Sequence, residues 1–257
     1  MNKYRCGLSV NIGYERESQE DFVQFQELDE KNLLCLIADG TGSREEYPKP
    51  AAIVVMDIID HIKRIFNEEK TLFFRNPEYF LKDAFRCANQ TLGALKLGNE
   101  ELFSGYAASV TAALFTEYNK VHFCHCGNTR AYIMRDGRLT QITKDHTKGA
   151  ELYEQGTIDY ETYHVHPDRL KMTSGIGVLL NPVIQTATGV LRPNDLVILT
   201  TDGVHYAIRQ EFIMNLVLEG HNCEEAAANL VNASLNGVKY PDNMAAMVIH
   251  GNPDIEA

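Results

Sequence analysis

The apolar residues of this chain recur with two different periods, and the period changes in blocks. Apolar runs and alternation typical of strands cover residues 4–12, 22–26 and 33–38, and two segments with helical spacing follow from Pro50 and Pro77. The later blocks are strands over 108–116, 121–126, 130–135, 185–190 and 195–201, helices over 210–218 and from Asn222, and a last strand over 244–250. This order argues against an alternating βαβ fold and favours antiparallel sheets with helices packed outside them.

Local turn and cap signals add detail to this outline. Asp136-Gly137 separates two strand-like stretches and is typical of a two-residue hairpin, so we expect residues 107–140 to form one antiparallel meander. Asn76 before Pro77 predicts a helix N-cap with proline in the first turn. Asn222 with Glu225 three residues later is close to a capping box. Residues 147–182 are polar and irregular, and they predict only short helical pieces.

Size and charge restrict the class of protein. The chain has 257 residues, 44% hydrophobic and 23% charged, so we expect a single folded domain over residues 1–257. Its 35 acidic and 24 basic residues give a net charge of −11, which disfavours nucleic acid and anionic lipid as partners. No apolar run approaches the roughly 20 residues of a membrane helix, and no signal-peptide pattern opens the chain. We therefore expect a cytoplasmic protein with no membrane partner and with its six cysteines reduced.

Four aspartates fall at the ends of predicted strands. Asp39 and Asp202 each follow a buried strand and precede a glycine, whereas Asp21 and Asp242 come just before a strand. In antiparallel sheets the end of one strand and the start of its neighbour share a rim, so these side chains can converge. Clustered carboxylates repel one another unless a cation binds among them, and all-oxygen ligands suit Mg²⁺ or Mn²⁺. The alternative is that each Asp-Gly pair is an ordinary turn after a strand.

Short motifs that carry these aspartates follow one another along the chain. They are Arg16-Glu17-Ser18-Gln19-Glu20-Asp21, Asp39-Gly40-Thr41-Gly42, Ala108-Ser109-Val110-Thr111-Ala112, Gly127-Asn128-Thr129-Arg130, Asp145-His146, Thr201-Asp202-Gly203-Val204 and Asp242-Asn243. In this order they resemble the metal-dependent protein phosphatases of type 2C, in particular the bacterial serine/threonine phosphatase branch, over nearly the whole chain. The resemblance implies an α+β fold, a four-layer α-β-β-α sandwich of two antiparallel sheets flanked by helices.

The resemblance also implies a set of site residues. Asp39 would be catalytic as the ligand that bridges two metal ions, and Arg16 would bind the substrate phosphate, because a guanidinium matches two phosphate oxygens. The other metal ligands would be the Gly40 carbonyl, Asp202 and Asp242 at the first ion, and Glu20 and Asp21 at the second. Two Mn²⁺ or Mg²⁺ ions about 3.5–4 Å apart would acidify a water that attacks phosphorus in line.

Four positions depart from the family pattern. Gln19 replaces an asparagine, which affects only a hydrogen bond outside the metal ligands. Asn128 replaces an aspartate that can hold a third metal, so a third metal site is in question. Thr41 stands where some members have a histidine as general acid, and Ser43 replaces a glycine in the loop that follows.

A histidine- and cysteine-rich strand invites a second interpretation. His122, Cys124 and Cys126 would share one face of strand 121–126, but no second cluster completes a zinc site, so we expect buried structural residues. His146 is a candidate general base, but a hydrogen-bonded loop residue is the favoured interpretation.

The resemblance implies hydrolysis of phosphoserine and phosphothreonine in proteins by a monomeric enzyme that acts on a serine/threonine kinase or its targets. A flap over residues 147–182 would set selectivity. The alternative is a catalytically weak or inactive module that binds phosphoproteins or a kinase, and a third hypothesis is a calcium-stabilised structural domain. The complete carboxylate set with Arg16 favours the enzyme.

Overall fold

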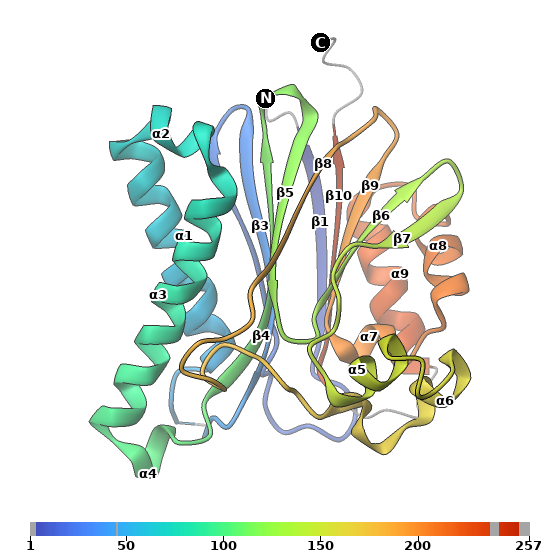
Figure 1. Ribbon diagram of the computed structural model, residues 1–257. Coiled ribbons are helices and arrows are strands. Elements are labelled where there is room, and N and C mark those ends of the chain that lie inside the picture. The colour runs from blue at the N-terminus through green and yellow to red at the C-terminus, as the bar shows by residue number, and fades with distance from the viewer. Residues whose placement is uncertain (1–3, 45, 237–241, 252–257) are drawn as a thin grey trace.

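The computed structural model describes residues 4–44, 46–236 and 242–251, which form two antiparallel sheets stacked face to face (Figure 1). The strands are β1 (Tyr4–Asn11), β2 (Phe22–Asp29), β3 (Asn32–Thr41), β4 (Ala107–Thr116), β5 (Lys120–Cys126), β6 (Arg130–Arg135), β7 (Arg138–Gln141), β8 (Gln185–Val190), β9 (Leu196–Thr200) and β10 (Met244–Gly251). One sheet has the order β1-β10-β9-β6-β7 and the other β2-β3-β4-β5-β8.

Helices cover the outer face of each sheet. They are α1 (Pro50–Glu68), α2 (Lys70–Arg75), α3 (Pro77–Gly98), α4 (Glu100–Phe103), α5 (Lys148–Glu154), α6 (Tyr160–Val165), α7 (Asp202–His205), α8 (Gln210–Leu218) and α9 (Cys223–Asn236). In Figure 1, α1 and α3 lie against the β2–β5 side, and α8 and α9 lie on the opposite side. The predicted four-layer α-β-β-α sandwich is therefore confirmed. No helix within the described ranges is both long and apolar enough to cross a membrane.

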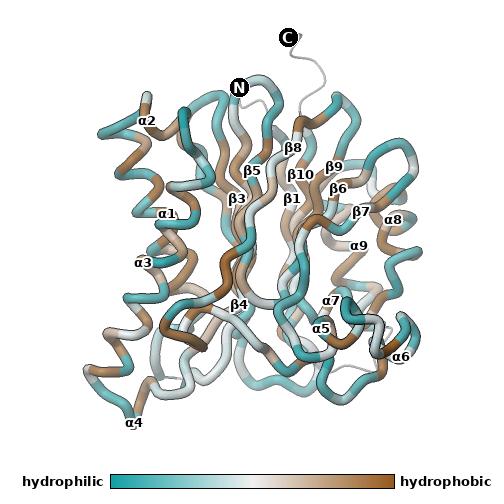
Figure 2. The backbone as a smooth tube through the Cα atoms, viewed as in Figure 1, coloured by the Kyte–Doolittle hydropathy of each residue, from teal (hydrophilic) through white to brown (hydrophobic). Residues whose placement is uncertain are grey.

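The layers are held together by three hydrophobic clusters, one at each interface. The first joins α1 and α3 to one sheet, the second fills the space between the sheets, and the third joins the other sheet to α8 and α9. Figure 2 shows this pattern as hydrophobic stretches along the strands and hydrophilic loops at both ends. Burial of apolar area at three interfaces supplies most of the driving force for this fold.

The two long outer helices begin at prolines, as predicted. Pro50 and Pro77 both occupy the first turn, where a missing N–H leaves no helical hydrogen bond unmade. The prediction that Asn76 caps α3 is wrong in one respect, because its side chain makes no cap hydrogen bond. At α9 the predicted cap is present, since the Glu225 N–H donates to Asn222 Oδ1 over 2.9 Å.

The prediction of one meander over residues 107–140 is wrong. β4 and β5 pair in one sheet, whereas β6 pairs with β7 and β9 in the other. The chain crosses between the sheets at Gly127, whose φ is 117° and where a Cβ would lie 2.4 Å from Ser109 Oγ. Only glycine fits this crossing. Strand periodicity cannot reveal it, because strands in either sheet alternate in the same way.

The strand that carries Asp39 is longer than expected and contains no turn at Asp39-Gly40. β3 continues to Thr41, and Asp39 pairs with Ser109 of β4. A Cβ on Gly40 would lie 3.0 Å from both the Glu20 carbonyl oxygen and the Ala51 amide nitrogen. The glycine therefore permits a close approach of three segments, and the alternative of an ordinary turn is wrong at this position.

Candidate functional site

An acidic cleft lies at one end of the sandwich, beside the C-terminal end of β3. The residues that line it come from the segment before β2, the end of β3 with its following loop, and the segment before β10: Glu15, Arg16, Glu17, Ser18, Glu20, Asp39, Gly40, Thr41, Gly42, Ser43, Asp242 and Asn243. The structure thus brings the predicted Arg16, Glu20, Asp39, Gly40 and Asp242 to one cleft. The remaining predicted ligands are buried, with 5% of Asp21 and 6% of Asp202 exposed.

Strand pairing explains how the aspartates meet. Phe22 of β2 pairs with Ala38 of β3 in antiparallel register, so the next residues, Asp21 and Asp39, lie opposite each other. The Thr201 N–H donates to the Ala245 carbonyl over 3.0 Å, which holds the start of α7 beside the start of β10. The Thr201 hydroxyl in turn donates to Asp21 Oδ2 over 2.7 Å and ties one sheet to the other.

Asn243 organises the loop that carries Arg16 and Glu20. Its Nδ2 donates to the carbonyls of Ile12 over 2.8 Å and Ser18 over 3.1 Å, and its Oδ1 accepts from the Glu20 N–H over 2.7 Å. The sequence motif included this residue without assigning it a role. The only sequence signal was its place next to Asp242.

Negative charge in the cluster is poorly balanced by the protein. Burial raises the pKa of Asp39 and of Asp21 well above the ordinary value, and neighbouring aspartates raise both further. Burial and the proximity of Asp242 raise the pKa of Asp202 to about 7. The neighbouring side chains supply too little positive charge to balance these carboxylates, so a bound cation would stabilise their charged form.

Glu20 has a different environment. Its Oε1 accepts hydrogen bonds from the hydroxyls of Ser18 over 2.8 Å and Ser43 over 2.5 Å, and it pairs with Lys49 Nζ at 3.2 Å. Burial alone would raise the pKa of Glu20, but these hydrogen bonds and Lys49 lower it. Oε2 is buried and has no hydrogen-bond partner among the described residues. Sequence reasoning missed Lys49, and it noted Ser43 only as a departure from the family pattern.

Asn128, the predicted departure at a third metal site, contacts the cluster directly. Its Nδ2 donates to Asp202 Oδ2 over 3.1 Å, and its buried Oδ1 has no partner among the described residues. An aspartate here would be a further anionic ligand, whereas the amide is a hydrogen-bond donor to an existing one.

The donor set suits hard divalent ions. It consists of carboxylate oxygens, and Glu20, which lines the cleft, has a buried oxygen without a hydrogen-bond partner among the described residues. Buried carboxylates with raised pKa values favour a bound cation, and oxygen ligands select Mg²⁺ or Mn²⁺ over zinc. Among the described residues, the group of three His, Cys, Asp or Glu side chains whose ligand atoms lie within 4.8 Å of one another is found elsewhere, between α1 and α3. In the cleft, no three ligand atoms from such side chains of the described residues all lie within 4.8 Å of one another.

A buried ion pair supports the segment after β7. Arg130 Nε lies 2.9 Å from Asp145 Oδ1, Nη2 lies 2.6 Å from Oδ2, and the Tyr163 and Tyr206 hydroxyls donate to Oδ2 over 2.8 and 3.2 Å. Burial alone would raise the pKa of Asp145, but the Arg130 guanidinium holds it well below its ordinary value. The pair connects β6 to α6 and thereby anchors the predicted flap.

The other histidine and cysteine candidates have structural roles. Nδ1 of His146 accepts a hydrogen bond from the Gly127 N–H over 3.1 Å, as expected for a loop residue. Cys124 and Cys126 lie in the hydrophobic cluster beneath α1 and α3, and His122 contacts the Thr188 hydroxyl at 2.8 Å. They form no group of metal ligands within the part of the chain that the structure describes.

Comparison with known proteins identifies the family. The model of the protein phosphatase 2C family matches residues 14–238. The chain belongs to the protein phosphatase 2C family. Membership makes it a serine/threonine protein phosphatase that depends on divalent metal ions.

Individual relatives of this phosphatase are bacterial. The serine/threonine protein phosphatase PstP of Mycobacterium tuberculosis is 33% identical over 169 residues, which cover 65% of this chain but only 32% of PstP. The protein phosphatase PhpP of Streptococcus pneumoniae is 22% identical over 97% of this chain and 98% of its own length. A PstP catalytic domain crystallised with two manganese ions superposes with a TM-score of 0.78 at 26% identity, and the match covers 96% of this chain and 97% of that domain.

Proposed function

We propose that residues 1–257 act as one catalytic domain that hydrolyses phosphoserine and phosphothreonine in proteins, with two Mn²⁺ or Mg²⁺ ions held in the acidic cleft. The observation that carries this proposal is that Asp21, Asp39, Asp202 and Asp242, distant in sequence, lie close enough together for neighbouring aspartates to raise the pKa values of Asp21, Asp39 and Asp202. The PstP domain with two manganese ions supports the number of ions.

The proposed ligands divide into two groups. Asp39 would contact both ions, with the Gly40 carbonyl, Asp202 and Asp242 at the first ion and Glu20 and Asp21 at the second. When bound, the ions would lower the pKa of a water nucleophile and neutralise the phosphate oxygens. Because Glu20 Oε1 is engaged by Lys49, its unpartnered Oε2 is the oxygen better placed to accept a further partner.

Arg16 would hold the substrate phosphate. Its side chain is 51% exposed at the cleft, so it can reach a phosphorylated side chain that enters from solvent. A guanidinium offers two parallel N–H donors to a phosphate, which orients the phosphorus for attack. Ser43 and Lys49 would act on catalysis only by positioning Glu20.

The biological setting follows from the chemistry of the substrate. Phosphoserine and phosphothreonine monoesters are made by protein kinases, so we propose that a serine/threonine kinase or its targets are the substrates. We further propose that the enzyme acts as a monomer in the cytoplasm. Residues 147–182 would select among phosphoproteins. Exchange of this segment with that of a relative should transfer peptide preference.

The decisive experiment measures hydrolysis of p-nitrophenyl phosphate and of a phosphothreonine peptide with Mn²⁺, with Mg²⁺ and with chelator. Asp39→Asn should reduce turnover more than about 100-fold. Loss of a residue that only hydrogen-bonds a metal ligand already costs about 10- to 100-fold, and Asp39 is proposed as a ligand itself. Asp60→Asn, an exposed aspartate on α1, is the matched control and should retain activity. Binding of phosphopeptide with no metal-dependent turnover in the unmodified protein would overturn the proposal in favour of a binding module.

A further inference from the structure

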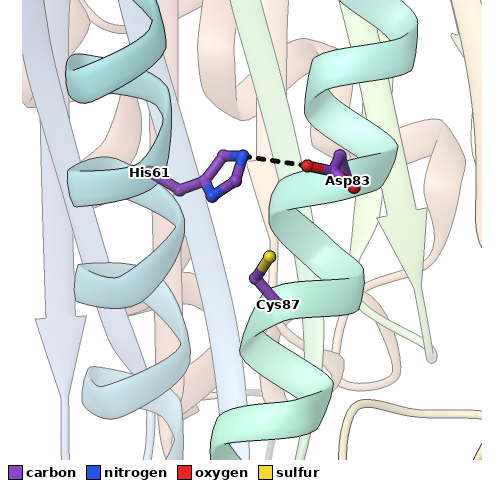
Figure 3. A group of neighbouring side chains, drawn as sticks. All are labelled: His61, Asp83 and Cys87. Atoms are coloured by element: carbon purple, nitrogen blue, oxygen red, sulfur yellow. Dashed lines mark ion pairs between the residues drawn. The ribbon is translucent and has the colours of Figure 1, made fainter.

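A second group of candidate ligands lies between α1 and α3, on the outside of the sandwich (Figure 3). His61 of α1 faces Asp83 and Cys87 of α3, and one ligand atom of each lies within 4.8 Å of the other two. His61 stands about 16 Å along the helix from Pro50, the first residue of α1, which lies beside Gly40 in the cleft region. The group is therefore separate from the proposed phosphatase site.

Helix geometry explains why these side chains meet. Asp83 and Cys87 are four residues apart on α3, so they project from the same face one turn apart. α1 packs beside α3, and the His61 ring points at Asp83, with Cys87 one turn further along α3, as Figure 3 shows. Nε2 of His61 lies 3.2 Å from Asp83 Oδ2. Ligand atoms around a tetrahedral ion with bonds of about 2.0–2.3 Å are roughly 3.3–3.8 Å apart, so this pair already has the required separation. The Cys87 thiol lies within 4.8 Å of a ligand atom of each of the other two residues.

The histidine nitrogen lacks an alternative partner. The His61 side chain is 12% exposed, and Nε2 is buried without a hydrogen bond of good geometry among the described residues. Buried polar atoms in folded proteins are nearly always satisfied by hydrogen bonds, whereas Nε2 has, among the described residues, only its ion-pair contact with Asp83. A cation would satisfy all three groups together.

The surrounding charge favours a cation. The carboxylates of Asp83 and Asp57 lie close enough to the Cys87 thiol to affect its ionisation. The positive charge that acts on the same thiol is Arg64, whose Nη1 pairs with Glu68 at 3.4 Å. A cation bound by His61, Asp83 and Cys87 would therefore be surrounded by net negative charge.

The ligand types define the class of ion. Imidazole nitrogen, thiolate sulfur and carboxylate oxygen together suit zinc and related transition metals, whereas Mg²⁺ and Mn²⁺ prefer oxygen alone. We propose that His61, Asp83 and Cys87 form a binding site for a divalent cation of the zinc class, which joins α1 to α3 and leaves a fourth position for water. The phosphatase cleft and this helix site would thus select different metals.

Cobalt is a suitable probe because a cobalt–thiolate bond gives a charge-transfer absorption that oxygen ligands do not. The full chain is titrated with Co²⁺ in the presence of excess Mg²⁺, which occupies the all-oxygen cleft. We expect one equivalent of Co²⁺ to produce the thiolate band and one equivalent of Zn²⁺ to abolish it. Cys87→Ser should remove the band, and His61→Asn and Asp83→Asn should weaken binding by more than about a hundredfold, since even outer-sphere partners of metal ligands are worth about 10- to 100-fold.

Matched controls separate this site from the other thiols and from misfolding. Cys223→Ser changes a half-buried cysteine on α9 and should leave the band unchanged. Melting temperatures without added metal establish that each variant is folded. Phosphatase activity with Mg²⁺ should be unchanged in Cys87→Ser, so the result is independent of the proposed function. Absence of the band in the unmodified protein, or its persistence in folded Cys87→Ser, would overturn the proposal.

Discussion

The guanidinium of Arg16 and the carboxylate of Asp242 form an ion pair at the acidic cleft, with Nη2 2.9 Å from Oδ1. The pair links the loop before β2 to the segment before β10, and it joins the proposed phosphate-binding residue to a proposed metal ligand. Asp242 is 16% exposed and Arg16 is 51% exposed, so the arginine is the partner that can turn towards a substrate.

Arg16→Ala should therefore raise KM for a phosphothreonine peptide. Loss of charged hydrogen bonds worth about 1.5–3 kcal/mol corresponds to about 10- to 100-fold. Arg16→Lys should recover only part of the affinity, because lysine is a point charge without the paired donors of a guanidinium. Steady-state kinetics measure both variants, and Arg138→Ala on β7 serves as an exposed control. Equal KM values for the unmodified protein and Arg16→Ala would exclude the proposed role.

Removal of a cleft carboxylate should stabilise the protein in chelator while it removes metal binding. Asp39 is surrounded by Asp21, Asp202 and Asp242, which all disfavour its charge. Asp39→Asn should therefore unfold at higher denaturant concentration than the unmodified protein in chelator, because the substitution removes a carboxyl whose charge is disfavoured in the folded state. Saturating Mn²⁺ should reverse the order, since an ion at 100 times its Kd adds about 2.7 kcal/mol to a protein that binds it. Urea unfolding with and without Mn²⁺ tests this, and a variant less stable in both conditions would contradict it.

A carboxylate at position 128 should change the number of bound ions. Asn128 donates to Asp202 Oδ2, so Asn128→Asp replaces a donor with a like charge at about the same distance. We expect a lower melting temperature in chelator and one additional Mn²⁺ by isothermal titration calorimetry. Asn128→Ala removes the hydrogen bond without adding charge and should bind the same number of ions as the unmodified protein. Identical stoichiometry in all three proteins would exclude a latent third site.

The Arg130–Asp145 pair should be important for stability. Arg130 is 5% exposed and Asp145 is 8% exposed, so Asp145→Asn leaves a buried guanidinium without its counter-charge. Breaking a buried pair in this way costs about 3–5 kcal/mol. The exposed pair Arg64–Glu68 is the control, and Glu68→Gln should cost no more than about 1 kcal/mol. Thermal unfolding compares the two, and similar losses would show that burial does not decide the effect.

Acid should destabilise the protein through His125. Burial, with a smaller effect of His146, lowers the pKa of His125 to about 3. Its ring contacts the Thr111 hydroxyl at 2.8 Å through Nδ1 and the Lys144 carbonyl at 3.1 Å through Nε2, an arrangement for the neutral ring. The unfolded chain takes up this proton near pH 6.5 and the folded protein does not, so stability falls as pH decreases from 6.5 towards 3.

The expected loss through His125 is about 1.6 kcal/mol between pH 6.5 and pH 5, because the slope reaches about 1.4 kcal/mol per pH unit only once the unfolded histidine is fully protonated. His125→Asn should be less stable at neutral pH but should lose correspondingly less on acidification. Urea unfolding with excess Mg²⁺ gives the free energy of unfolding of both proteins at pH 6.5 and pH 5. The titration of other groups contributes equally to the two proteins and cancels when their losses are compared. Parallel losses in the two proteins would assign the acid sensitivity to other residues.

Local patterns predicted the elements with good accuracy because each rests on short-range chemistry. The hairpin at Asp136-Gly137 is present, and both residues have positive φ values of 49° and 71°. The helix from Pro50 buries the predicted apolar stripe, including Ile58 and Ile62. The error in the stretch 107–140 arose at Gly127, where the decision between two sheets depends on contact with Ser109 rather than on neighbours in sequence.

By itself, the sequence determined the order of strands and helices, the family motifs and the residue types around Asp39, because periodicity, turn chemistry and charge are properties of neighbouring residues. Only the tertiary structure decided which groups became partners. Lys49 meets Glu20, and His61 of one helix meets Asp83 and Cys87 of another. Such contacts join residues far apart in the chain, and they exist only after burial of the apolar faces has brought the layers together.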